Sequence, residues 1–236
     1  MIPLRDSNPT RRTPIVTAAL IAACAAVFVV ELQVSSRPGG DAALDQMLTE
    51  WGAVPSRITA ALGGTGDPWL AARGILGSMF LHAGWPHLLG NMLFLWIFGN
   101  NVEDRLGRLA YLGFYLAGGT IAALAQVLIE PASDIPLVGA SGAIAATLGA
   151  YIVLYPGARI TSLVFLGFLA QLIDVPAIVI LGFWFLLQLL DGVASLGAAT
   201  AQGGVAFFAH IGGFVAGALV GLLVRATSPR PGRSGG

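Results

Sequence analysis

The chain has 236 residues, of which 56% are hydrophobic and only 10% charged, and its formal net charge is zero. A mean hydropathy of +0.81 indicates an integral membrane protein rather than a soluble domain of this length. Every basic residue is an arginine, and the arginines stand singly or in pairs, so no basic stripe indicates a nucleic-acid partner. The single cysteine, Cys24, has no intrachain disulfide partner and suits a small apolar packing position.

Six apolar segments are predicted to cross the bilayer, for which a helix needs about 20 residues. In chain order they cover residues 14–30, 86–102, 109–129, 140–155, 176–190 and 206–224. The first segment follows Arg11 and Arg12, and we expect it to remain as an uncleaved anchor, because no small-x-small cleavage site follows it. The second begins at Pro86, a residue suited to a first helical turn. The sequence therefore predicts an all-α polytopic membrane protein.

Residues 32–85 form a predicted external loop between the first two membrane spans. Loops longer than about 15 residues are usually functional or disordered. The segment 42–51 has a helix-like pattern, and Trp51, Trp69 and Trp85 favour a position in the headgroup region. We expect part of this loop to lie along the membrane surface.

The apolar segment 160–173 is too short for a comfortable span and is closed by Asp174 and Pro176, so we place it at the interface. Six crossings then put both termini in the cytoplasm. The positive-inside rule supports this count. The arginines that would face the cytoplasm are Arg5, Arg11, Arg12, Arg105, Arg108, Arg159, Arg225, Arg230 and Arg233, which leaves Arg37, Arg57 and Arg73 outside.

The predicted domain organisation is a single membrane domain over residues 14–225, which includes the external loop. The cytoplasmic tails, 1–13 and 226–236, are rich in proline, arginine and glycine and are expected to be disordered. No repeat of the solenoid type is visible.

Four polar residues lie near the starts of the second, fourth and sixth spans, which all begin on the external face in this topology. His87 and Asn91 are four residues apart and share one helix face, while Ser141 and His210 begin the other two spans. Ionisable residues at membrane depth are costly and are candidates for function. All four side chains are therefore predicted to share one depth near the external face.

Serine and histidine at one depth suggest hydrolysis, because a serine hydroxyl becomes a good nucleophile when a nearby base removes its proton. Ser141 lies at a helix start, where free backbone N–H groups favour a developing anion. His210 can serve as the base. His87, Asn91 and the backbone N–H of Ser141 can form an oxyanion hole.

Close helix packing is needed to bring the serine and histidine together, and small residues at four-residue spacing allow it. The sixth span carries Gly213, Gly217 and Gly221, and the fourth span offers a matching small surface made of Gly142, Ala145, Ala146 and Gly149.

No acidic third member of a catalytic triad is predicted. Asp134 and Asp191 lie in predicted external loops, and nothing orients them toward the histidine, so we predict a serine–histidine dyad. Gln126, Gln171 and Gln188 receive no assignment.

Alternative functions have weaker support. A metalloprotease is disfavoured because no H-E-x-x-H motif occurs and the three histidines lack acidic companions, so neither a metal nor a cofactor is expected. A transporter would show paired broken helices or midplane charges. Taken alone, Ser141 could be a small helix contact and His210 an interhelical hydrogen-bonding residue.

Four motifs together resemble the six-span bacterial rhomboid intramembrane serine proteases. They are Phe80–Trp85 with His87 and Asn91, Gly99–Gly107, Gly139–Gly142, and Ala209–Gly213 with Gly217. The resemblance implies that Ser141 is the nucleophile, that His210 is the general base, and that His87 and Asn91 stabilise the oxyanion. It also implies cleavage of the transmembrane segments of client proteins near the external face of the cytoplasmic membrane, with water and no cofactor. Glu103 and Arg105 would belong to a structural cytoplasmic turn, with Asp104 as a further helix-end charge, and His82 would bond loop backbone.

Two departures from the rhomboid pattern leave questions open. Arg73 and Gly74 occupy positions where rhomboids commonly carry a Trp-Arg pair, which leaves the structure of the external loop open. Ala145 occupies a position where some members place a tyrosine that packs on the catalytic histidine, so what positions the His210 ring is open. Phe183, Trp184 and Phe185 are expected to face lipid or to pack. The rival interpretation is a non-proteolytic rhomboid-like protein that binds client helices, although such proteins usually lack the serine or the histidine.

Overall fold

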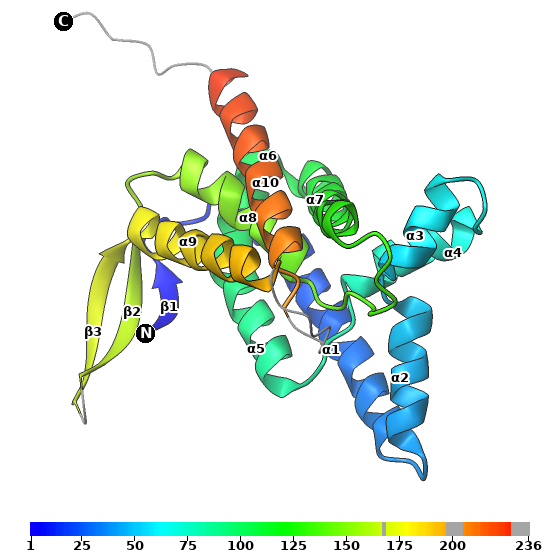
Figure 1. Ribbon diagram of the computed structural model, residues 1–236. Coiled ribbons are helices and arrows are strands. Elements are labelled where there is room, and N and C mark those ends of the chain that lie inside the picture. The colour runs from blue at the N-terminus through cyan, green and yellow to red at the C-terminus, as the bar shows by residue number, and fades with distance from the viewer. Residues whose placement is uncertain (167–168, 197–204, 228–236) are drawn as a thin grey trace, which may run out of the picture.

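The structure is a computed structural model that describes residues 1–166, 169–196 and 205–227 (Figure 1). It is mostly helical, with a small sheet at one side of the helices. The helical elements are α1 (Ile15–Ser35), α2 (Gly40–Trp51), α3 (Pro55–Leu62), α4 (Pro68–Ser78), α5 (Trp85–Phe94), the π-helical turn η1 (Leu95–Gly99), α6 (Asn100–Leu106), α7 (Arg108–Ile129), α8 (Ser141–Leu154), α9 (Ala177–Ser195) and α10 (Phe207–Thr227).

Each of the six predicted spans coincides with helical residues. Most of the predicted ends agree with the observed helix ends to within a few residues. Among the described residues, four helices are long and apolar enough to cross a membrane: α1, α7, α9 and α10. Helix α8 is apolar but has only 14 residues. The second predicted span is divided among α5, η1 and α6, which follow one another without a gap.

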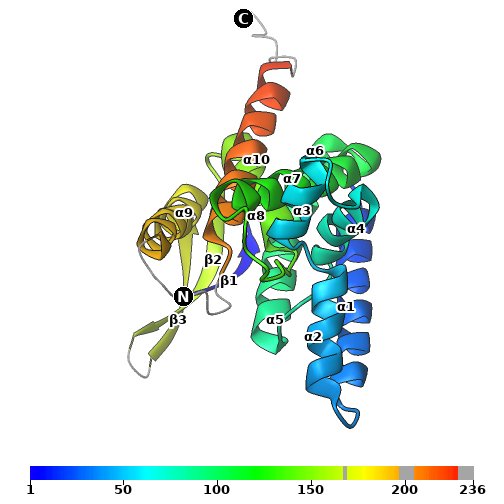
Figure 2. The ribbon, with the colours of Figure 1, turned by 45° about the vertical axis from the view of Figure 1, so that its right-hand side comes forward.

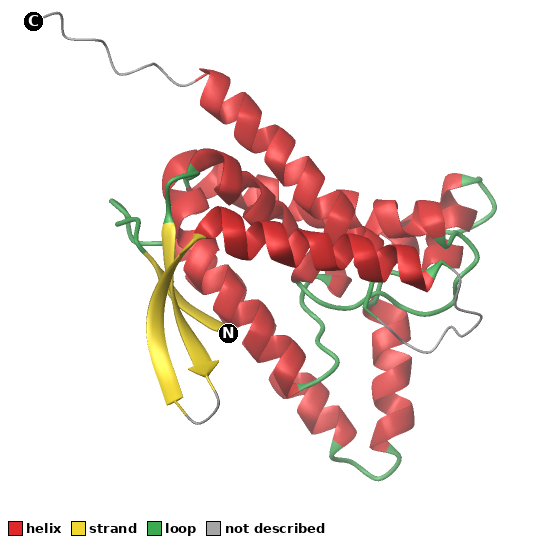
Figure 3. Cartoon of the chain, turned by 60° about the vertical axis from the view of Figure 1, so that its left-hand side comes forward, coloured by secondary structure: helices red, strands yellow, loops and turns green. Residues whose placement is uncertain are grey.

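The expectation of an all-α fold is wrong, because three strands form an antiparallel sheet in the order β1 (Ile2–Asp6), β2 (Arg159–Leu166) and β3 (Leu169–Pro176). The sheet stands apart on one side of the helices (Figure 3). The segment 160–173, placed at the interface as an apolar piece, is thus the main part of a β-hairpin. Ile160 and Ser162 are buried while Arg159 is exposed, which is the two-residue alternation of a strand.

The N-terminal tail 1–13, expected to be disordered, is anchored at several points. β1 pairs with β2, which is more than 150 residues away in the sequence. The Asp6 carboxylate accepts hydrogen bonds from the Tyr151 hydroxyl at 2.8 Å and the Asn101 side-chain amide at 2.6 Å. The other predicted tail, 226–236, begins at the end of α10, and its residues from 228 on lie outside the described residues.

Glu103 stabilises the start of α1 rather than the turn that contains it. Its buried carboxylate accepts from the backbone N–H groups of Val16 at 3.0 Å and Thr17 at 2.7 Å, and from the Thr17 hydroxyl at 2.8 Å. These are N–H groups of the first turn, which have no partner within the helix itself. A carboxylate from α6 thus caps α1.

The segment predicted as an external loop, 32–85, contains three helices, and α2 matches the helix-like patch 42–51. In Figure 2, α1 and α2 lie side by side. The Arg73 guanidinium of α4 lies 4.8 Å from the centre of the Trp51 ring and donates to the Glu50 carbonyl at 2.8 Å. Gly74 lies so close to Gly52 that a Cβ there would meet the Gly52 carbonyl oxygen at 2.6 Å. Arg73 and Gly74, which occupy the positions of the missing Trp-Arg pair, therefore hold α4 against α2.

Helix α8 lies at the centre of the fold, and α10 packs directly on it through glycines. Residues 143–150 are all buried. A Cβ on Gly213 would collide with the carbonyl oxygen of Gly142, and one on Gly217 would collide with that of Ala146. The two backbones touch, as a small-residue stripe permits. This approach sets the distance between the two helix starts that carry Ser141 and His210.

Candidate active site

Ser141 is the first residue of α8, and a turn that contains Gly139 precedes it. Gly139 has φ of +120°, a conformation that side chains other than glycine rarely adopt, and its N–H donates to the Ser78 carbonyl at 2.8 Å. A Cβ at Gly139 would lie 2.6 Å from the His87 ring and 3.6 Å from the side-chain nitrogen of Asn91. The glycine is therefore required both by its backbone conformation and by the close approach of α5.

His210 lies in the first turn of α10, and its Nε2 atom is 2.7 Å from the Oγ atom of Ser141. The histidine is 8% exposed. Helix α9 lies across α10 in Figures 1 and 3, and its Trp184 ring packs near the His210 ring. The structure thus places the two residues within direct hydrogen-bond distance, although 69 positions separate them in the sequence.

Gln188 of α9, which received no assignment from the sequence, completes a chain of three polar groups. Its Oε1 atom lies 2.6 Å from Nδ1 of His210, and the side chain is 9% exposed. The Trp184 ring, one turn earlier, lies 5.7 Å from the His210 ring between centres. A polar residue four positions after a tryptophan in an apolar helix was the available signal. Side chains of α9 therefore contact the His210 ring in place of the tyrosine that some rhomboids carry at the position of Ala145.

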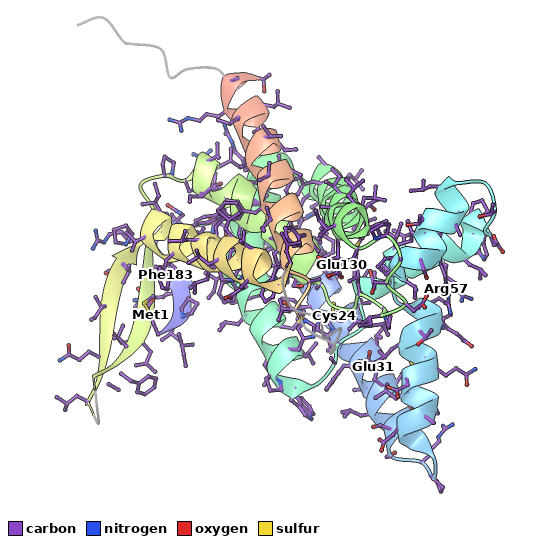
Figure 4. All side chains as sticks on the ribbon, viewed as in Figure 1. Met1, Cys24, Glu31, Arg57, Glu130 and Phe183 are labelled. Atoms are coloured by element: carbon purple, nitrogen blue, oxygen red, sulfur yellow. The ribbon has the colours of Figure 1, made fainter. Side chains whose placement is uncertain are left out.

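Of the three aromatic residues expected to face lipid or to pack, two pack and the third is exposed on the helix surface. Trp184 and Phe185 pack on Phe214 of α10, with ring centres 6.1 and 4.5 Å apart. Phe183, labelled in Figure 4, is 61% exposed on α9. Cys24 is also labelled there, and it is fully buried among apolar residues.

Asn91 and His87 reach the serine turn from α5. The Asn91 side chain is 9% exposed, and its Nδ2 atom is buried without a hydrogen-bond partner. The backbone N–H of Ala83 donates to Nδ1 of His87 at 3.4 Å, which favours a proton on Nε2. The Nε2 atom of His87 lies beside Gly139. Both side chains therefore direct N–H donors at the turn that carries Ser141.

His82 has a structural setting outside the serine–histidine pair. Its Nδ1 atom lies 3.1 Å from the Phe80 carbonyl oxygen, so it bonds loop backbone, and its own N–H donates to Glu31 at 3.0 Å. Burial, and then the charge of nearby His87, lower the pKa of His82 to about 4. The ring is therefore neutral at physiological pH.

The two aspartates considered as a third catalytic member lie elsewhere. Asp134 accepts a hydrogen bond from the Ser56 hydroxyl at 2.6 Å and ties the α7–α8 connection to α3. Asp191 is exposed on α9. Within the described ranges, no group of three or more histidine, cysteine, aspartate or glutamate side chains could hold a metal ion.

Comparison with known proteins agrees with this architecture. The model of the Rhomboid domain family matches residues 71–227, more than half of the chain. The chain therefore belongs to the rhomboid family, and it is a multi-pass membrane protein.

The similar relatives include three proteins from yeast and a bacterium. "Rhomboid protein 1, mitochondrial" of Saccharomyces cerevisiae is 34% identical over 153 residues, which are 62% of this chain and 40% of the yeast protein. "Rhomboid protease GluP" of Bacillus subtilis is 34% identical over 148 residues, 63% of this chain and 26% of that protein. "Putative rhomboid protease YdcA" of the same bacterium is 36% identical over 78 residues, 33% of this chain and 39% of that protein. The chain spans less than half the length of each.

Proposed function

We propose that this chain is an intramembrane serine endopeptidase that cleaves the transmembrane segments of client membrane proteins. Ser141 is the nucleophile and His210 the general base of a catalytic dyad. The observation that carries the proposal is the 2.7 Å separation between Ser141 Oγ and His210 Nε2 at the buried junction of α8 and α10. Three relatives with protease or rhomboid names support it.

In the proposed reaction, His210 Nε2 takes the hydroxyl proton while Ser141 Oγ attacks the scissile carbonyl carbon. The resulting oxyanion is held by the side-chain nitrogen of Asn91, by His87 and by the backbone N–H of Ser141. A single such donor contributes about 2.7 to 4 kcal/mol of transition-state stabilisation. His210 then gives its proton to the leaving amine, and water, activated by the same ring, hydrolyses the acyl-enzyme.

The unpartnered amide of Asn91 fits an oxyanion donor. A buried donor without a partner costs about 1 to 3 kcal/mol, and few native structures retain one without a reason. Its position beside Gly139, two residues before the nucleophile, puts it where a tetrahedral intermediate would form. The cost of leaving the amide unpaired in the resting enzyme is then offset in the transition state.

The proposed topology has six crossings in the cytoplasmic membrane, with both termini in the cytoplasm. The arginine distribution and the six helical segments support it. Helices α5, α8 and α10 then begin on the external side, which puts the active site near the external face. A client helix must unwind locally there, because its carbonyls are otherwise bonded within the helix.

The proposal is tested by cleavage in proteoliposomes with a panel of single-span substrates that carry small or helix-breaking residues near the external interface. We expect the wild type to release fragments from at least one substrate, and Ser141→Ala and His210→Ala to release none. Ser36→Ala, which removes an exposed hydroxyl at the end of α1, is the matched control. Cleavage by Ser141→Ala contradicts the proposal, and stable substrate capture without cleavage by the wild type indicates the client-binding protein instead.

A further inference from the structure

We propose that Gln188 is a positioning residue that holds the His210 ring in the one tautomer able to accept a proton from Ser141. The inference rests on the proposed function for its catalytic consequence. Its structural part stands on the 2.6 Å separation between Gln188 Oε1 and His210 Nδ1, which joins two buried side chains from different helices.

The tautomer follows from the hydrogen-bonding capacity of each atom. A carbonyl oxygen can only accept, so a bond between Gln188 Oε1 and Nδ1 requires the ring proton on Nδ1. Nε2 is then unprotonated and accepts from the Ser141 hydroxyl, which lies 2.7 Å away. The opposite tautomer leaves Nε2 unable to take the proton, and in other serine proteases the wrong tautomer is strongly damaging.

The glutamine also fixes the plane of the ring together with its neighbours on α9. Trp184, Gln188 and Gly192 recur every four residues and so share one face of that helix. Trp184 packs on the His210 ring, and Gly192 permits contact with α10, since a Cβ there would lie 3.3 Å from Phe207. One turn after Ser141, helix α8 carries only the methyl group of Ala145, so the groups that orient the far nitrogen and the plane of the ring come from α9.

An amide suits this depth better than a carboxylate. An ionised aspartate or glutamate is expensive to hold within a membrane. A glutamine gives the same acceptor atom to Nδ1 without the desolvation cost of a full charge. The alternative is that Gln188 merely ties α9 to α10, as buried polar residues do between membrane helices. The alternative predicts a loss of stability on substitution with no change of tautomer.

The first test compares three variants with the wild type in substrate cleavage. Gln188→Leu keeps the side-chain size and removes the acceptor, and we expect kcat to fall about tenfold with KM unchanged. Gln188→Glu restores an acceptor, and we expect kcat within about threefold of the wild type, with the acid limb of the pH–rate profile moved to higher pH. Gln126→Leu is the matched control, because Gln126 is a buried glutamine that accepts from the backbone N–H of Ala209, next to His210, without touching the ring. Its pH–rate profile should keep the wild-type shape.

The second test measures the tautomer directly and does not depend on activity. The chain has three histidines, so ¹⁵N-imidazole labelling gives few signals, and those of His210 are identified by their loss in His210→Gln. We expect a protonated Nδ1 in the wild type and in Gln188→Glu, and a mixture of tautomers in Gln188→Leu. An unprotonated Nδ1 in the wild type, or an unchanged signal and kcat in Gln188→Leu, overturns the proposal. If the wild type shows the expected tautomer but cleaves nothing, the proposed function fails while the positioning by Gln188 stands.

Discussion

Two buried asparagines of this protein differ in their hydrogen bonds, and the difference matches the oxyanion role proposed for one and a structural role for the other. Asn91 has a side-chain nitrogen without a partner beside the serine turn. The side-chain nitrogen of Asn101 donates to Asp6 at 2.6 Å and to Asn100 at 2.8 Å. Only the second contributes hydrogen bonds to the stability of the resting protein.

Alanine substitutions at the two asparagines should therefore affect different properties. Asn91→Ala should lower the cleavage rate, and Asn101→Ala should lower the stability. Asn91→Ala removes an oxyanion donor, so we expect kcat to fall about 100- to 1,000-fold. Its unfolding temperature should be unchanged or slightly raised, because an unsatisfied buried group is lost. Asn101→Ala should lower the free energy of unfolding by about 1 to 3 kcal/mol. Cleavage rates and thermal unfolding in detergent check both, and an Asn91→Ala variant that is destabilised yet fully active would show that the assignment is wrong.

Sequence reasoning found most of the polar residues of the site but missed Gln188. Ser141, His210, His87 and Asn91 were identifiable because each lies near the start of an apolar segment that begins on the same side. Gln188 lies in the interior of α9, and its partner depends on how that helix is rotated against α10. Hydropathy and spacing carry little information about that rotation, so only the assembled helices reveal the contact.

Among the helices, the glycines of α10 determine how closely α10 approaches α8. Alanine at Gly217 would place a methyl group against the Ala146 carbonyl, whereas alanine at Gly113 of α7 would meet nothing within 4 Å. We expect Gly217→Ala to lose about 1 to 3 kcal/mol of stability and most of the cleavage activity. Gly113→Ala should be neutral or gain about 0.5 to 1 kcal/mol, since glycine disfavours a helix interior. Equal unfolding temperatures for the two variants would contradict the packing described for α8 and α10.

The start of α1 offers a second comparison between neighbouring residues. Glu103→Ala leaves two backbone N–H groups and a hydroxyl of α1 without their buried acceptor, so we expect a loss of about 2 to 3 kcal/mol in the free energy of unfolding. Asp104→Ala removes only exposed bonds to the backbone N–H groups of Arg11 and Arg12, and should cost about 1 kcal/mol or less. Denaturant unfolding in micelles measures both losses. A larger loss for Asp104→Ala would show that Glu103 does not cap α1.

The helices were largely predictable from sequence, but the sheet was not. Apolar runs of about 15 to 20 residues indicate helices strongly, whereas a run of fourteen closed by aspartate and proline suits a strand pair equally well. β1 is still harder to predict, because its formation depends on pairing with β2, which is distant in the chain. The tail was expected to be disordered on composition alone, and composition says nothing about distant partners.

For the protein as a whole, stability should depend on pH through His82, which lies between α4 and α5. Its pKa is about 4 in the folded protein against 6.5 in the unfolded chain, because the ring is buried and His87 lies 5.2 Å away between ring centres. A lowered pKa means that the unfolded state takes up the proton first, so the contribution of His82 to stability is complete above about pH 6.5 and declines as the pH falls toward 4. The loss across this window is about 2 to 3 kcal/mol.

The measurement is thermal unfolding in detergent between pH 7.5 and pH 4.5 for the wild type and His82→Gln. The variant cannot take up a proton at this position, so its unfolding temperature should fall less steeply on acidification. Parallel pH dependences in the two proteins would assign the effect to other groups.

Covalent labelling shows whether Ser141 is a nucleophile activated by His210. Purified wild-type protein is treated with a fluorophosphonate probe, and the modified residue is located by mass spectrometry. We predict a single adduct on Ser141, no labelling of Ser141→Ala, and labelling of His210→Ala slowed at least about 100-fold, since general-base catalysis contributes roughly that factor. Absence of labelling in the folded wild type, or undiminished labelling of Ser141→Ala, would show that Ser141 is not the nucleophile.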